Sequence, residues 1–268
     1  MSIVSEIDRI KTNIANAYTV CKEKGATMPS VLNSANLSNC ISSVTGGGTG
    51  SIDSGYVTDG LLIHLSGLTH IDLSYWIDTV RGNYATLNRT PTYDSENKCY
   101  VFNGSTQYGQ FDLVGATGDF TLEVYGERVS GATRFDVGCG KNFGTYAGYG
   151  LCNNSGYSYC WVNTNNQSYT IPTEARPTLI DDRKFYSRLS RETAQMYYDL
   201  KDIERKVAET FTGNSSDVGV TTFYFATNGT DRTAYSKCKI YAIRIYNRKL
   251  TDEEIQQNYE QDVRNFGA

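Results

Sequence analysis

The sequence predicts an all-β domain, a two-sheet sandwich, joined at its N-terminus to a short α-helical arm. Three observations predict this class. The 268-residue chain has 21 Tyr and 25 Gly but only 4 Pro and 3 Met, which is typical of strands joined by many turns. From residue 52 onward, short apolar or alternating stretches recur between Gly- and Asn-rich turns. Residues 3–21 instead repeat apolar residues at spacings of four and three, which indicates a helix.

The arm is predicted to span residues 1–45, and its first helix carries a heptad seam. The seam residues are Ile3, Ile7, Ile10, Ile14, Ala17 and Cys21. Isoleucine at both core positions of a heptad favours trimers or tetramers over dimers. We therefore expect self-association, as a homotrimer, through residues 1–45. The alternative is that the first helix is an amphipathic helix packed on its own domain. A second short helix is expected at about residues 34–44, and it could fold back on the first as a helical hairpin or pack around the oligomer axis.

A flexible linker is predicted at residues 46–51, where the sequence reads G-G-G-T-G-S. The linker separates the arm from a domain at residues 52–268. Its first strand is expected at residues 61–65. A hairpin is expected at residues 100–111, because the favoured turn pair Asn103-Gly104 lies between two apolar stretches. A further strand is expected at residues 120–125, where Phe120, Leu122 and Val124 alternate with Thr121, Glu123 and Tyr125.

The end of the chain predicts a strand followed by a helix. Tyr241, Ile243 and Ile245 should share one face of the strand, because side chains alternate along it. Thr251 and Glu254 have the spacing of a capping box, so a helix should begin there.

Composition and charge argue against several function classes. The net charge is −4 and no basic domain is evident, so no nucleic-acid partner is expected. The dense Lys/Arg region, residues 183–191, reads as a solvated strand face. No apolar run is long enough to insert into a membrane, and the N-terminus lacks a signal-peptide core. Seven cysteines without a C-x-x-C pair indicate free thiols in a protein assembled in a reducing cytoplasm. The sequence leaves undecided whether a Cys139–Cys160 or a Cys152–Cys160 disulfide forms.

No catalytic motif is evident, so the protein is not expected to be an enzyme. The nearest carboxylate pair on one strand face is Glu123 and Glu127. At strand spacing these two lie roughly 13 Å apart, too far for either class of glycosidase. The spacing of Cys and His fits no zinc motif, and no other cofactor is indicated.

The residue types that remain suit ligand binding. Aromatic rings pack on the apolar faces of sugars, and amides pair with sugar hydroxyls. The candidate ligand-binding residues are Tyr146, Tyr149, Asn153, Tyr157, Tyr159, Trp161 and Asn163, with Asp231 and Arg232 as a second, weaker candidate. The alternative is that the tyrosines only pack and the asparagines only make turns.

Two resemblances refine these expectations. The segments D-G-L-L-I-H-L, V-F-N-G-S-T-Q-Y-G, D-F-T-L-E-V-Y and the closing I-Y-A-I-R-I-Y-N-R with L-T-D-E-E-I resemble laminin-G-like domains of the concanavalin A-like jelly-roll class. The arm, with I-D-R-I-K-T-N-I and N-S-A-N-L-S-N-C-I, resembles the N-terminal segment of phage tail-associated and other virion proteins.

These resemblances imply a virion protein, of tail-fibre, receptor-binding or head-fibre type, assembled in the cytoplasm of a bacterial host. Its partners would be other virion proteins and a host-surface or mucosal glycan. Some relatives of the fold bind calcium at an edge of the sandwich, so the resemblance leaves undecided whether this domain binds calcium. Two alternatives remain: a purely structural capsid-decoration or fibre module, and a glycan hydrolase with an unrecognised site.

Overall fold

The computed structural model divides the chain into two compact units, Met1–Ser54 and Gly55–Ala268. The structure describes residues 3–23, 28–34, 36–37, 40, 55–112, 118–132, 134–139, 148–154, 157–163, 168–170, 176–178, 180–193, 195–202, 206–212, 222–228 and 232–268. The predicted linker at residues 46–51 lies outside them, so the domain boundaries at 45 and 52 stay predictions.

The first unit is built on helix α1 (Ile3–Glu23). A small cluster of buried residues holds it, consisting of Tyr18, Cys21 and Cys40 with the partly buried Ile14, Met28 and Leu37. Of the predicted seam, Ile7 and Ile10 are 45% and 47% exposed, whereas Cys21 is buried inside the unit. Ala17 is half-buried and the side chain of Ile3 is not described. The seam is therefore divided: its C-terminal half packs within the first unit, and Ile7 and Ile10 are exposed. Most of the second helix predicted near residues 34–44 lies outside the described residues, so the hairpin stays a prediction.

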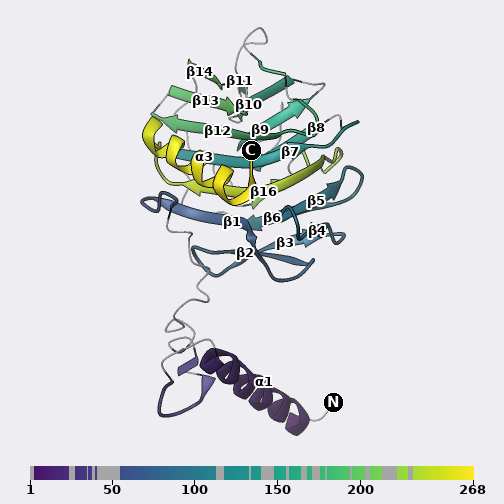
Figure 1. Cartoon of the computed structure of the whole chain (residues 1–268), viewed down its shortest axis with the longest axis vertical. Coiled ribbons are helices and arrows are strands. Elements are labelled where there is room, and N and C mark those ends of the chain that lie inside the picture. Colours follow the sequence, from purple (N-terminus) through teal and green to yellow (C-terminus); the bar gives the residue numbers. More distant parts are fainter. Residues whose placement is uncertain are drawn as a thin grey trace. The chain divides into compact units, whose positions relative to one another are not determined.

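The second unit is a sandwich of antiparallel strands, ending in a helix (Figure 1). The strands of its first half are β1 (Leu61–His70), β2 (Tyr75–Asp78), β3 (Tyr84–Asn88), β4 (Thr92–Asp94), β5 (Cys99–Asn103), β6 (Tyr108–Asp112), β7 (Phe120–Arg128) and β8 (Arg134–Cys139). The second half contains β9 (Gly148–Asn154), β10 (Tyr157–Asn163), β11 (Ser168–Thr170), β12 (Lys184–Glu192), β13 (Gln195–Lys201), β14 (Lys206–Thr212), β15 (Thr222–Phe225), β16 (Lys237–Tyr246) and the helix α3 (Asp252–Phe266).

Two layers face each other across the core. One runs β14-β13-β12-β7-β16-β1, and the other runs β2-β3-β6-β15-β8-β9-β10-β11. Strand β1 belongs to both layers. Its N-terminal part, Leu61–Ser66, pairs with β16, and Leu65 and His70 pair with β2, with a register shift between these two residues. Rings from the two layers meet between them: Phe120 on β7 stacks on Tyr149 on β9, with ring centroids 3.9 Å apart. The fold is thus a jelly-roll-like β-sandwich of the concanavalin A type, as predicted.

Helix α3 lies across β12, β7 and β16 on the side away from the core (Figure 1). The predicted capping box is confirmed: Thr251 accepts from the N–H of Glu254, and the Glu254 side chain accepts from the N–H of Thr251. Because α3 covers them, all positions of β7 are buried, those facing the core and those facing the helix. No described helix combines the length and apolar character that crossing a membrane requires.

Three local predictions were wrong. A register shift between Ile240 and Ala242 turns Tyr241 to the helix side, where its hydroxyl donates to Glu127, so it does not share a face with Ile243 and Ile245. β5 and β6 do not form a hairpin, since β5 pairs with β4 and β16 whereas β6 pairs with β3 and β15.

The third wrong prediction is the solvated face at residues 183–191. Arg188 and Arg191 are only 3% and 1% exposed. Strand β12 is central in its layer, between β7 and β13. Arg188 lies directly opposite Asp199 of β13, and its Nε donates to that carboxylate at 2.7 Å. The charge is retained inside because a cross-strand partner neutralises it.

Candidate functional site

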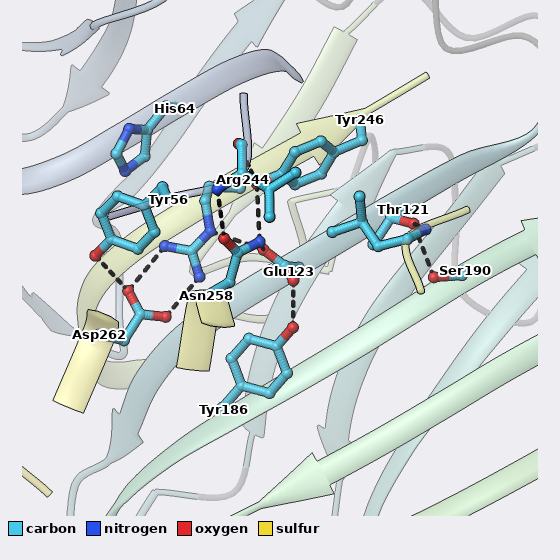
Figure 2. A network of polar contacts seen from close by, with 12 residues as sticks. Tyr56, His64, Thr121, Glu123, Tyr186, Ser190, Arg244, Tyr246, Asn258 and Asp262 are labelled. Atoms are coloured by element: carbon cyan, nitrogen blue, oxygen red, sulfur yellow. Dashed lines mark hydrogen bonds and ion pairs between the residues drawn. The ribbon is translucent and has the colours of Figure 1, made fainter. Parts of the chain in front are cut away.

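A dense network of polar side chains lies between α3 and the sheet (Figure 2). At its centre is Arg244 of β16, which donates through Nε to Glu123 of β7 at 2.7 Å. Its Nη1 and Nη2 donate to the two oxygens of Asp262 on α3 at 2.8 and 2.5 Å. Burial acts to lower the pKa of Arg244, but Asp262 and Glu123 outweigh it and raise the pKa well above its usual value. The guanidinium is therefore permanently charged.

Further groups complete this cluster. Asn258 of α3 donates to Glu123 and to the hydroxyl of Tyr246, both at 2.9 Å. The Tyr186 hydroxyl also donates to Glu123, and the Tyr56 hydroxyl donates to Asp262 at 2.7 Å. The side chains of Arg244, Glu123 and Asp262 are wholly inaccessible. The cluster resembles a catalytic site in composition, but no substrate can reach it in this conformation, so it fastens α3 to the sheet.

The two carboxylates of the sequence argument are both engaged in such contacts. Glu123 is held by Arg244, and Glu127 accepts from the Tyr241 hydroxyl at 2.9 Å and pairs with Lys239 at 2.7 Å. Neither is exposed as an acid and nucleophile pair would have to be. Within the described residues, no three His, Cys, Asp or Glu side chains are gathered as metal ligands. All seven cysteines are buried thiols, so neither of the two bridges left open by the sequence is present.

The predicted ligand-binding residues fall on both faces of one pair of strands. Tyr149 and Asn153 lie on β9, and Tyr157, Tyr159, Trp161 and Asn163 lie on β10. Tyr149 is wholly buried and stacked on Phe120, so it is a packing residue and not a surface contact. Tyr146 and Asp231 lie outside the described residues.

Strand register separates the remaining positions. Position 149 pairs with 162 and position 153 with 158, so both belong to the face of β10 opposite to 157, 159, 161 and 163. Because position 149 faces the core, the backbone places these four β10 positions on the outward face. The predicted set is thereby reduced to a stripe along β10.

A second set of aromatic and amide residues, which sequence reasoning missed, lies on the outward side of the same layer. We call it the tyrosine face; its residues are Tyr75, Tyr84, Thr86, Asn88, Tyr108, Gln110 and Tyr224. Tyr75 and Tyr84 are 47% and 55% exposed, with ring centroids 5.8 Å apart. The alternation Tyr84-x-Thr86-x-Asn88 is a signal that could have identified it.

The tyrosine face and the β10 stripe are continuous in register. Tyr75, Thr86, Gln110 and Tyr224 lie directly opposite one another on β2, β3, β6 and β15. The same row continues from Tyr224 through Gly138 and Gly150 to position 161 of β10. At the usual spacing between strands, this row is roughly 29 Å long.

A pocket of about 460 Å³ opens at one end of the tyrosine face. Its lining residues are Asn88, Arg89, Thr106, Tyr108, Arg232 and Tyr235; we call it the Arg232 pocket. The Arg232 guanidinium lies 5.7 Å from the Tyr108 ring centroid, and its Nη1 donates to the Tyr108 hydroxyl at 3.0 Å. That hydrogen bond raises the pKa of Arg232. Of the predicted pair Asp231 and Arg232, the structure thus places Arg232 at a cavity.

A second pocket, of about 500 Å³, lies between β12–β14 and the start of α3. Its charges largely pair with one another: Arg188 with Asp199, and Lys249 with Glu192. The Lys249 ammonium also lies 4.0 Å from the Tyr197 ring centroid and covers that face of the ring. The Arg232 pocket differs from this second pocket, because its described lining contains two arginines and no acidic side chain.

Comparison with known proteins supports the fold and no more. No protein-family model and no curated protein matches the sequence. Among solved structures, the binding domain of botulinum neurotoxin serotype D is 12% identical with a TM-score of 0.57, over 76% of this chain and 52% of that chain.

Two further structures are similar to the same degree. A structure of botulinum neurotoxin type C, whose cell entry is described as dependent on interaction with two ganglioside molecules, is 9% identical with a TM-score of 0.55, over 75% of this chain and 51% of that chain. Trypanosoma rangeli sialidase is 18% identical with a TM-score of 0.58, over 97% of this chain and 40% of that chain. This chain therefore spans about half, or less, of the structures that it resembles. All three likenesses show a β-sandwich fold.

Proposed function

We propose that the unit Gly55–Ala268 is a non-catalytic, lectin-like domain that binds glycans across the tyrosine face. The observation that carries the proposal is the cross-strand row Tyr75–Thr86–Gln110–Tyr224, with the Arg232 pocket beside it. Exposed tyrosine rings offer flat apolar surfaces for sugar rings, and the amides and hydroxyls between them pair with sugar hydroxyls.

The length of this surface favours a chain of sugars over a single sugar. The row runs on in register from Tyr224 to position 161, roughly 29 Å from Tyr75 at the usual strand spacing. Rings spaced along such a row can each contact a different residue of one extended glycan. The pocket's volume is also within the range typical of small-ligand sites.

The comparisons support a sugar ligand by analogy only. One structure of the same fold is described through its interaction with gangliosides and another is a sialidase. Fold alone does not carry a function, so the weight lies on the residues of the tyrosine face.

We place this domain in a phage virion, as a tail-fibre, receptor-binding or head-fibre protein presented in three copies by the first unit. What supports the placement is the N-terminal sequence pattern, together with the exposure of Ile7 and Ile10 on α1. Several copies held together turn weak sugar contacts into strong attachment, because after one head binds, the others are at high local concentration.

The test is binding of the full-length protein to a glycan array and to bacterial surface polysaccharides. Tyr75→Ala and Tyr84→Ala should each weaken binding roughly fivefold or more, as expected for the loss of one stacked ring. Tyr259→Ala, at a half-buried tyrosine on α3, is the matched control and should leave binding unchanged. Folded protein that binds no glycan would exclude this function and favour the purely structural module.

A further inference from the structure

The Arg232 pocket is rich in hydrogen-bond donors. Arg89 and Arg232 are both exposed at it, and the Arg89 side chain has no ion-pair partner among the described residues. The Nδ2 of Asn88 is buried and donates to no described group. Among the described residues only the Tyr108 hydroxyl accepts from Arg232, through one nitrogen, so the other N–H groups of Arg232 have no described acceptor.

The pocket is held in shape by side chains that do not themselves face a ligand. Arg89, Thr90 and Arg232 have positive φ angles of 61°, 45° and 50°, which non-glycine residues adopt only at a cost. The Gln107 amide secures the first two, since its Nε2 donates to the carbonyl oxygens of Arg89 and Thr90 at 3.1 and 2.9 Å. These carbonyls, which would repel an anion, are thereby occupied.

The second strained loop is secured in the same way. The Asn228 carboxamide oxygen accepts from the backbone N–H groups of Thr233 and Ala234 at 3.0 and 3.2 Å. Its Nδ2 donates to the Thr233 hydroxyl at 2.9 Å. The backbone on both sides of the pocket is thus fixed by one amide side chain each, which limits how far the two arginines can move apart.

Charge distribution distinguishes this pocket from the rest of the chain. The protein carries a net charge of −4, so its general field repels anions. Among the described residues that line the pocket, two are arginines and none is acidic. Guanidinium groups pair with planar or tetrahedral oxyanions through several N–H groups at once.

From this arrangement we propose that the Arg232 pocket binds the anionic group of an acidic sugar, while the tyrosine face carries the adjoining neutral sugars. This inference rests on the proposed glycan binding and adds the ligand class. The anionic group is an oxyanion such as a carboxylate or a sulfate. Arg89 and Arg232 hold it from two sides.

The test uses three polymers with one backbone: dextran, carboxymethyl-dextran and dextran sulfate. Binding of the full-length protein is measured by biolayer interferometry at 50 and 300 mM salt. The charged polymers should bind at least tenfold more tightly than dextran, and this preference should shrink as salt rises. Arg232→Gln and Arg89→Gln should each reduce binding of the charged polymers roughly tenfold, as expected for a lost charge-assisted hydrogen bond.

Arg264→Gln is the matched control, because it removes one positive charge from an exposed position on α3. It should leave the preference unchanged, and unfolding curves should show that all three variants are folded. Preference for one charged polymer alone supports the inference and identifies the group as carboxylate or sulfate. Equal binding of all three polymers, or an equal loss in Arg264→Gln, overturns the acidic-sugar inference. Tyrosine-dependent binding of neutral glycans on the array would then leave the proposed function standing, whereas silence in both assays would overturn both.

Discussion

His64 makes a quantitative prediction about acid stability. It lies on β1, is 2% exposed, and its ring meets Tyr56 edge-on with centroids 4.9 Å apart. The Nδ1 lies 3.2 Å from the hydroxyl oxygen of Thr79, and the buried Nε2 has no hydrogen-bond partner among the described residues. Burial, and then the charge of Arg244, lower the pKa of His64 to about 3.

The direction of the pH effect follows from the two states. In the unfolded chain His64 is protonated near its ordinary pKa of about 6.5, whereas in the folded protein it is protonated only near pH 3. Between these values acid favours the unfolded state, so stability is complete above pH 6.5 and declines as the pH falls. At pH 5.5, one unit below the unfolded pKa, the loss attributable to His64 is about 1.4 kcal/mol.

The assay is urea unfolding at pH 7.5 and 5.5, followed by tryptophan fluorescence. Both tryptophans, Trp76 and Trp161, lie in the second unit, so the signal reports that unit. The wild type and His64→Gln are compared, and their difference cancels neighbouring groups such as Asp78, whose pKa is raised by burial. His70→Gln is the matched control, because the chain has only these two histidines.

We expect His64→Gln to lose about 1.4 kcal/mol less than the wild type when the pH is lowered from 7.5 to 5.5. The His70→Gln control should behave as the wild type does. The reasoning is refuted if His64→Gln retains the full pH dependence, or if NMR shows the His64 imidazole titrating near pH 6.5 in the folded protein.

Two further predictions concern the α3 cluster and the first unit. Arg244→Met leaves Glu123 and Asp262 buried without their cation, so the free energy of unfolding should fall by about 3–5 kcal/mol. The control Arg264→Met, at an exposed site on α3, should change the free energy of unfolding little. A loss below about 1 kcal/mol in Arg244→Met would contradict the proposal that the cluster fastens α3 to the sheet. The double variant Ile7→Asp/Ile10→Asp should be a monomer in mass photometry, where the wild type is expected to be a trimer. The control Val31→Asp, at an exposed apolar residue outside the helix, should remain a trimer. A monomeric wild-type protein would refute the prediction of a trimer.

Several parts of the fold could be predicted from local sequence because local chemistry determines them. The start of α3 depends on Thr251 and Glu254, three residues apart, and both hydrogen bonds of the capping box are formed. Strand β7 could be recognised from the alternation of Phe120, Leu122 and Val124, which face the core. The prediction that tyrosines and amides form a sugar-binding surface stays a prediction; the structure shows only that such residues line an outward face at positions that the sequence argument did not select.

Other parts depend on which segments become neighbours. Periodicity places Tyr241 with Ile243, but the extra residue at the register shift reverses its face. Arg188 appears solvated in the sequence because its partner Asp199 lies across the β12–β13 pair and α3 closes over the same sheet. Tyr149 and Tyr159 look equivalent in the sequence, but pairing of β9 with β10 assigns them to opposite faces.

The sequence by itself determined the helical arm, the β-sandwich class, the capped terminal helix and the lack of any familiar catalytic motif, since each depends on residues a few positions apart. Only the tertiary structure decided that the carboxylates Glu123 and Glu127 are buried, each paired with a cation of β16. It also decided that tyrosines from β2, β3, β6 and β15 form one outward surface ending at Arg232. The reason is physical: cross-strand register and the choice of covered face are set by long-range pairing, which no local spacing encodes.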